Sequence, residues 1–179
     1  MRIGVSGPHG TGKTTLVHEL CSRFTELTPI EEPYVLLEED GHDFEYPPSH
    51  ADYRAQLTRS IHLLTTEPDG SVFDRTPLDF LAYLSATGLD IESVTDTAAA
   101  RKALATLDLL VLVPITLDTE RLLPPAEMLG LRRAVDDTLL ELAYTDPLDL
   151  LANIPVLELT VPLTDRIETI AAMIRESGY

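Results

Sequence analysis

Short apolar runs alternate with longer stretches in which apolar residues recur every three or four positions. The runs predict five strands, at residues 2–6, 28–32, 72–73, 108–113 and 154–159. The longer stretches predict helices at residues 14–24, 51–66, 77–88, 98–107, 131–144 and 165–177. The run at 108–113 is apolar almost throughout, which is typical of a strand buried on both faces. Strands that alternate with helices predict an α/β protein with a parallel sheet covered on both faces.

Two segments between these elements lack a clear apolar period. Residues 35–50 are polar, acidic and proline-containing, which favours a loop that either flanks a substrate site or is simply exposed. Residues 117–131 carry arginines and the pair Pro124-Pro125, and we expect a short lid there. The length of 179 residues suits a single domain spanning residues 1–179.

The strongest motif lies between the first predicted strand and the first predicted helix. Residues 7–14 read G-x-x-x-x-G-K-T, the pattern of a phosphate-binding P-loop. Glycines let the backbone wrap around a polyphosphate, and its amides and the helix N-terminus then face the anion. Lys13 is expected on the β- and γ-phosphates, and Thr14 on Mg²⁺. The predicted nucleotide-binding residues are Gly7, Pro8, His9, Gly10, Thr11, Gly12, Lys13, Thr14 and Thr15. A plain glycine-rich turn is the alternative.

Charged residues follow the second and third predicted strands. In parallel sheets, ligands bind at the carboxyl ends of the strands, so these residues are expected beside the P-loop. Glu31 and Glu32 are candidates for a general base on an acceptor hydroxyl or for a water-mediated contact to Mg²⁺. Glu32 is favoured because it directly precedes Pro33. Asp74 is a candidate for holding Mg²⁺ through water, and Arg75 for binding phosphate. The alternatives are a solvated acidic turn and an Asp–Arg pair that caps a helix.

Further candidates for the substrate site lie on the predicted helices and the lid. Asp79 lies one turn into its helix, and Tyr53, Gln56 and Arg59 fall near one another on theirs. All are candidate substrate contacts. The alternative is helix capping for Asp79 and a solvated flank of the helix for the other three. Among the arginines of the lid region, Arg121, Arg132 or Arg133 is expected to stabilise charge on a transferring phosphoryl group, and a solvated helix start is the alternative. We place Arg132 among the catalytic candidates.

Charge narrows the range of partners. Thirteen Lys and Arg against 30 Asp and Glu give a net charge of −17, which disfavours binding of nucleic acids. No apolar run is long enough to span a membrane, and the first strand begins at once, so we expect no signal peptide, no membrane association and a cytoplasmic location. The single cysteine, Cys21, excludes an internal disulfide. A homodimer remains open.

Three features together resemble the P-loop kinases of the nucleoside and nucleotide kinase group. They are the P-loop, Glu31-Glu32-Pro33 and Asp74-Arg75-Thr76. The last two resemble motifs of deoxynucleoside kinases, in which the Glu is the base for the sugar hydroxyl and the acidic-Arg pair contacts metal and phosphate. The run from Asp74 to Tyr83 also resembles predicted ATPase/kinase proteins related to ribosylnicotinamide kinase domains. The resemblance implies a three-layer P-loop NTPase fold with strand order 2-3-1-4-5. The lid lacks the dense arginine pattern of deoxynucleoside kinases.

These patterns predict an enzyme that uses ATP and Mg²⁺ to phosphorylate a small molecule, favouring a nucleoside or nucleotide. A nucleotide-binding regulatory ATPase that acts through a protein partner is the alternative. A GTPase is disfavoured because the chain has no Asn-Lys pair and hence no N-K-x-D motif.

Overall fold

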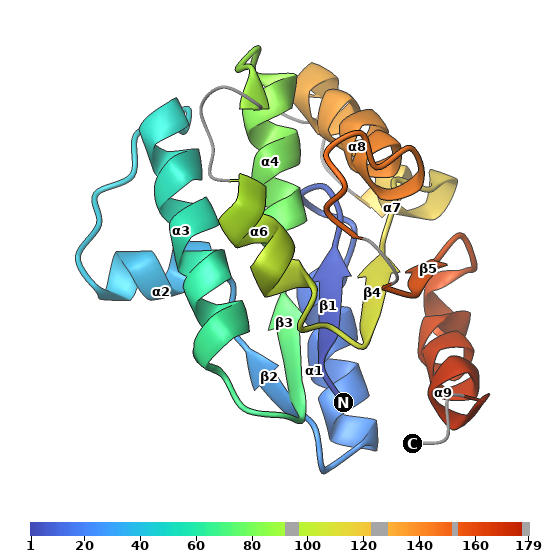
Figure 1. Cartoon of the computed structure of the whole chain (residues 1–179). Helices are drawn as coiled ribbons and strands as arrows, with labels where there is room; N and C mark the ends of the chain where they lie inside the picture. The colour runs from blue at the N-terminus through green and yellow to red at the C-terminus, as the bar shows by residue number, and fades with distance from the viewer. Residues whose placement is uncertain (92–96, 123–128, 152–153, 177–179) are drawn as a thin grey trace.

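Five parallel strands form the middle layer of the computed structural model, which describes residues 1–91, 97–122, 129–151 and 154–176. The sheet order is β2-β3-β1-β4-β5, as the resemblance implied (Figure 1). The strands are β1 (Ile3–Ser6), β2 (Thr28–Ile30), β3 (Ser71–Asp74), β4 (Leu109–Leu112) and β5 (Val156–Glu158). All five strand predictions are therefore confirmed.

Helices cover both faces of this sheet (Figure 1). One face packs against α1 (Lys13–Arg23) and α9 (Arg166–Glu176). The other packs against a larger group of helices. This group comprises α3 (His50–Thr66), α4 (Pro77–Ala86), α6 (Thr97–Leu104) and α8 (Leu129–Tyr144). Among the described residues, α2 (Pro33–Glu39) and α7 (Leu117–Leu122) are shorter, and a 3₁₀ turn, Leu163–Asp165, precedes α9.

The buried apolar side chains of the strands are divided between two separate cores. In β4, Leu110 and Leu112 pack with α3, α4, α6 and α8, whereas Leu109 and Val111 pack with α1 and α9. Successive side chains of a strand point to opposite faces, so a strand buried on both sides must be apolar at every position. This explains the continuous apolar run at 108–113. The three-layer α/β prediction is confirmed.

The segment at 35–50 differs from its prediction. Its first residues lie in α2, which begins at Pro33 with Glu32 as its N-cap residue. Pro33 was interpreted as the end of a strand, but proline is also favoured in the first turn of a helix, where its missing N–H costs nothing. The proline therefore ends one element and starts the next. Glu32 is consequently fixed at a helix N-terminus rather than in a loose loop.

The lid region is partly helical. α7 occupies Leu117–Leu122 and α8 begins at Leu129. Residues 123–128, with Pro124-Pro125, lie outside the described part of the chain. The lid at 117–131 therefore stays a prediction. Among the described helices, none is both long and apolar enough to cross a membrane.

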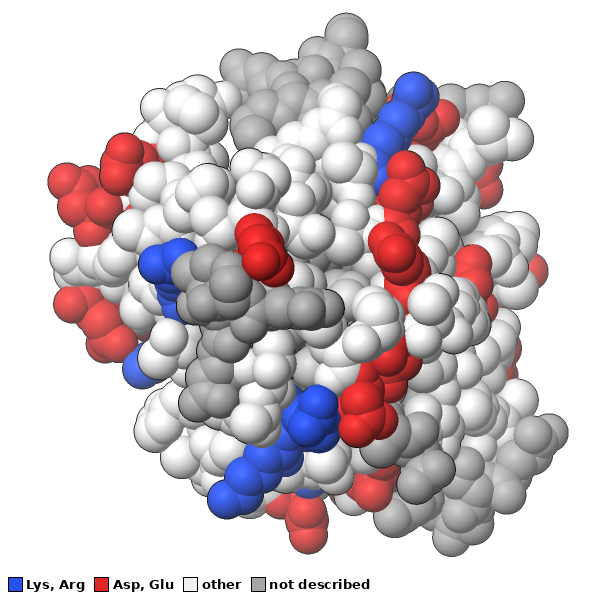
Figure 2. All heavy atoms as spheres, turned by 45° about the horizontal axis from the view of Figure 1, so that its top comes forward, with Lys and Arg blue, Asp and Glu red and all other residues white. Residues whose placement is uncertain are grey.

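The carboxyl ends of the strands lie at the top of Figure 1, where the loop after β1 is found. Figure 2 turns this face forward and shows a band of acidic side chains with fewer basic ones, as the net charge of −17 leads us to expect. Several cations of the site do not contribute to this surface, because Lys13, Arg132 and Arg166 are buried.

Candidate active site

The loop between β1 and α1 forms a cup of backbone amides. Gly10 and Gly12 have positive φ angles of 73° and 86°, conformations that favour glycine. A Cβ on Gly7 would lie 2.3 Å from the Val113 carbonyl oxygen, so only glycine fits where the loop passes β4. Gly12, Thr14 and Thr15 are exposed. The predicted nucleotide-binding residues therefore form one connection whose helical end is open to solvent.

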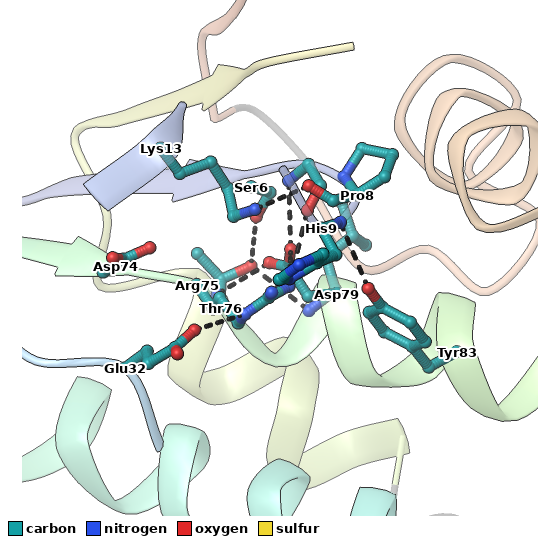
Figure 3. Close-up of polar contacts among 12 residues, drawn as sticks. Ser6, Pro8, His9, Lys13, Glu32, Asp74, Arg75, Thr76, Asp79 and Tyr83 are labelled. Carbon is teal, nitrogen blue, oxygen red and sulfur yellow. Dashed lines mark hydrogen bonds and ion pairs between the residues drawn. The ribbon is translucent and has the colours of Figure 1, made fainter. Parts of the chain in front are cut away.

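Lys13 lies against this loop rather than in solvent. Its side chain is 5% exposed, and Nζ donates a hydrogen bond of 2.8 Å to the Pro8 carbonyl oxygen (Figure 3). Burial, and secondarily the nearby positive charge of Arg75, lower the pKa of Lys13 to about 7, against the attraction of Asp79, Asp74 and Glu32. The ammonium is thus held at the cup, and within the described part of the chain it forms no ion pair.

Thr14 and Asp74 meet across the site at the end of β3. The Thr14 hydroxyl donates to Asp74 Oδ2 at 2.5 Å, while Asp74 Oδ1 is buried and has no hydrogen-bond partner in the described part of the chain. Burial raises the pKa of Asp74. A hydroxyl beside an unsatisfied carboxylate oxygen fits Mg²⁺, which takes oxygen ligands and commonly binds through one or two protein groups plus substrate phosphates. No cluster of three or more metal-binding side chains occurs among the described residues.

Arg75 links the second and third strands to the cup. Its Nε donates to Glu32 Oε2 at 2.8 Å, and its Nη1 lies 3.5 Å from Asp79 Oδ1 and 3.4 Å from the Gly7 carbonyl oxygen (Figure 3). The guanidinium also lies 5.7 Å from the centre of the Tyr83 ring. Despite burial, Tyr83, Asp79 and Glu32 raise the pKa of Arg75, which stays charged. Its φ of +77° is strained for a non-glycine residue, a feature that clusters at functional sites.

Asp79 holds the start of the P-loop through a hydrogen bond with its backbone. Its side chain is fully buried, and its two oxygens accept hydrogen bonds from the Gly7 amide at 3.0 Å and the Thr76 amide at 2.9 Å. The second bond completes the capping box of α4, in which Thr76 is the N-cap residue. The predicted substrate contact of Asp79 is untested, but these bonds already give the carboxylate a positioning role.

The candidates on α3 lie at different depths. Tyr53 is buried and stacks on Tyr83 with ring centres 5.0 Å apart, and burial raises its pKa to about 12. Gln56 is buried, and its side-chain amide donates to the Asp52 carbonyl oxygen at 3.3 Å. Arg59 pairs with Asp40 at 3.1 Å. Tyr53 therefore adjoins the site through Tyr83, whereas Arg59 ties α3 to the end of α2.

Of the two adjacent glutamates, Glu32 points to Arg75, whereas Glu31 is exposed. Since α2 begins directly after Glu32, its backbone is fixed by the helix start. The choice between the two as base stays a prediction, and this geometry favours Glu32.

The arginines of the lid region differ in their exposure and in their contacts. Arg132 is buried, and its Nε donates to the His9 carbonyl oxygen at 2.8 Å. Arg133 is exposed and pairs with Glu120 at 3.0 Å. The side chain of Arg121 lies outside the described part of the structure. Arg132 is thus the one of these predicted residues that the structure places in contact with the P-loop.

Arg166 was missed as a site residue. It opens α9, is 2% exposed, and its Nη1 donates to the Thr11 carbonyl oxygen at 2.7 Å. In the sequence it was visible only as a residue at the start of the last helix. No spacing rule connects it to a loop 155 positions earlier.

A parallel sheet of this order with a phosphate cup after β1 defines a P-loop protein with the fold of P-loop kinases. The family model described as "AAA domain" matches residues 2–162, so the chain belongs to this family. A search of curated proteins finds no significant match.

Solved structures with the same fold include several small-molecule kinases. Deoxyadenosine kinase from M. mycoides with bound dCTP has a TM-score of 0.61 at 17% identity, covering 98% of this chain and 100% of that one. NadR in complex with NAD and AMP-PNP has a TM-score of 0.68 at 25% identity, covering 99% of this chain but only 49% of NadR. Shikimate kinase from Acinetobacter baumannii with shikimate has a TM-score of 0.61 at 15% identity, with 99% and 94% covered. These likenesses place the chain among P-loop kinases by fold.

Proposed function

We propose that the protein transfers the γ-phosphoryl group of ATP, with Mg²⁺, to a hydroxyl of a small nucleoside-like molecule. The observation that carries this proposal is the convergence of three parts at one sheet edge. They are the glycine cup with Lys13, the Thr14–Asp74 pair, and the Glu32–Arg75 pair. Phosphoryl transfer needs positioning and charge stabilisation more than covalent chemistry, and this arrangement supplies both.

On the donor side, the cup amides and Lys13 hold the β- and γ-phosphates. Lys13 Nζ donates to the Pro8 carbonyl oxygen at 2.8 Å, and its ammonium form has two further N–H groups for phosphate oxygens. Thr14 and Asp74 would hold Mg²⁺, which neutralises charge on the β- and γ-phosphates when bound. The unsatisfied Oδ1 of Asp74 is the atom best placed for an oxygen contact to the ion or its water.

On the acceptor side, Glu32 orients the substrate hydroxyl and accepts its proton. The hydroxyl oxygen forms the new bond to the γ-phosphorus as the bond from that phosphorus to the leaving ADP oxygen breaks. Arg75 holds the Glu32 carboxylate at 2.8 Å and places a fixed positive charge beside the moving group. Arg132 contributes on the donor side through the loop that it contacts.

The charges around Glu32 favour a neutral acceptor over a nucleotide. A nucleoside monophosphate brings a phosphate that needs arginines of its own. Among the described residues, Arg75 is shared between Glu32 and Asp79, and Arg59 is paired with Asp40. Burial and the neighbouring Arg75 and Lys13 lower the pKa of His9, which disfavours a charged imidazole there. We therefore place nucleosides ahead of nucleotides as acceptors.

An acceptor screen tests this function. ADP release is measured with Mg²⁺ and ATP on a panel of nucleosides, their 5′-monophosphates and ribosylated vitamins, and products are identified by mass spectrometry. We expect release that depends on a nucleoside-like hydroxyl compound. ATP turnover that ignores every acceptor but responds to a protein partner would instead identify a regulatory ATPase.

Adjacent glutamates supply a matched pair of variants for the base. Glu32→Gln should lower kcat about 100-fold or more, since a positioned general base contributes on that order. Glu31→Gln should leave kcat close to the wild-type value, because Glu31 is exposed and Glu32 faces Arg75. The reverse pattern would assign the base to Glu31.

A further inference from the structure

The carbonyl oxygens on the outer side of the cup are held by side chains from distant parts of the chain. The His9 carbonyl accepts from Arg132 Nε at 2.8 Å, and the Thr11 carbonyl accepts from Arg166 Nη1 at 2.7 Å. Arg132 lies on α8 and Arg166 on α9, 123 and 155 residues further along the chain. Two helices of the C-terminal part of the fold therefore reach the same short loop.

Peptide geometry makes these two contacts relevant to the amides. In a planar trans peptide, a carbonyl and the N–H of the next residue point in opposite directions. Holding the His9 carbonyl outward therefore directs the Gly10 N–H inward, and holding the Thr11 carbonyl outward directs the Gly12 N–H inward. Gly10 and Gly12 have φ angles of +73° and +86°, and glycine rotates readily into other conformations. The amides with the least intrinsic restraint thus adjoin the two peptides that arginines hold.

A contribution to folding stability does not explain why the Arg166 side chain is buried. Its side chain is almost completely buried, and burial lowers its pKa. Its Nε and Nη2 have no hydrogen-bond partner, and it makes no ion pair within the part of the chain that the structure describes. A buried cation with so few partners costs folding free energy. Residues kept at a cost to stability are typical of functional sites.

We infer that Arg166 is a positioning residue of the phosphate cup, which fixes the Gly12 amide through the Thr11 carbonyl, and that Arg132 acts likewise on Gly10 through His9. The donor site is thereby organised before the nucleotide arrives. The identity of the bound anion rests on the proposed function, whereas the orientation of the amides does not.

Arg166→Met and Arg166→Lys test this role, with Arg175→Met as the matched control. Arg175 lies on the same helix, is exposed, and pairs with Glu168 at 3.9 Å, so its loss removes the same charge away from the loop. We expect Arg166→Met to weaken binding of Mg·AMP-PNP roughly 10-fold by calorimetry, the effect of one charge-assisted hydrogen bond. Arg166→Lys should recover part of this loss, and Arg175→Met should bind as the wild type does.

Two further measurements separate positioning from folding and from the proposed function. The Tm of Arg166→Met should equal or exceed that of the wild type, because a poorly partnered buried cation is removed. Amide exchange in the free protein should accelerate at Gly12 in Arg166→Met and stay unchanged in Arg175→Met. Unchanged nucleotide affinity together with unchanged exchange at Gly12 would overturn the inference.

Amide exchange also decides the inference if the wild-type protein binds no nucleotide at all. That result would refute the proposed function, while faster exchange at Gly12 in Arg166→Met would still establish the positioning role. Unchanged exchange would then remove both.

Discussion

The P-loop lysine is predicted to change its protonation state when nucleotide binds. Burial and the nearby charge of Arg75 lower the pKa of Lys13 to about 7 in the free protein. At pH 8, only about one molecule in ten then carries the ammonium form. Polyphosphate beside Lys13 favours the charged form, so binding at pH 8 should take up close to one proton.

The size of the effect follows from linkage. Between pH 7 and pH 9, the protonated fraction of free Lys13 falls from about one half to about one hundredth. If the bound ammonium stays protonated over this range, the Kd for Mg·AMP-PNP should rise roughly 50-fold. Calorimetry at pH 8 in two buffers with different ionisation enthalpies measures the proton uptake directly.

The protonation state of Lys13 can be followed by NMR, because Lys13 and Lys102 are the only lysines in the sequence. Lysine labelled with ¹³C at Cε should give two resonances, and Lys102→Arg assigns them. Lys102 is exposed on α6, whereas Lys13 is buried. Lys13 should titrate near 7 in the free protein, and binding of the nucleotide should raise its pKa. A Lys13 resonance that does not titrate near 7 in the free protein, with no proton uptake on binding, would refute the reasoning.

Three further predictions concern Lys13, Asp52 and Asp136. Lys13→Met should abolish phosphoryl transfer yet raise the Tm at pH 6, because a depressed lysine pKa costs stability most fully below that pKa; a lower Tm at pH 6 would contradict this. Asp52→Asn should lower the free energy of unfolding by about 1–3 kcal/mol at pH 7, as measured by denaturant titration. Against the effect of burial, hydrogen bonds from His42 and Ser49 lower the pKa of the Asp52 carboxyl to about 2. The difference between variant and wild type should therefore shrink as the pH falls from 4 to 2. Asp136→Asn should instead raise the Tm by about 4 °C at pH 8 and leave it unchanged at pH 4, because burial raises the pKa of Asp136 to about 6 and disfavours the carboxylate.

The parts of the fold that were predictable are those in which the local pattern and the tertiary environment agree. The run at 108–113 is largely apolar because β4 is buried on both faces of the sheet. The residue pattern alone therefore indicates the environment of this strand. The P-loop could be predicted from the sequence because its backbone conformation requires glycine at fixed positions. At Gly7, for example, there is no room for a Cβ atom. In both cases the chemistry that selects the residues is local.

Helix α2 was not predictable in this way, because Pro33 has two meanings. Proline ends a strand, but it also starts a helix, and the acidic residues that follow give little apolar period. Both meanings apply here, because β2 ends at Ile30 and α2 begins at Pro33.

Arg166 is a site residue that no local sequence pattern reveals. The loop motif specifies which residues can adopt the cup, but not what holds its peptides in place. Glycine permits the required φ angles without enforcing them, so the restraint must come from elsewhere in the fold. Here it comes from arginines whose own neighbours in sequence carry no trace of the loop. The P-loop motif in the sequence therefore indicates only which backbone conformations the loop can adopt. The residues that hold the loop in one of these conformations are identified only from the packing of the helices in the folded protein.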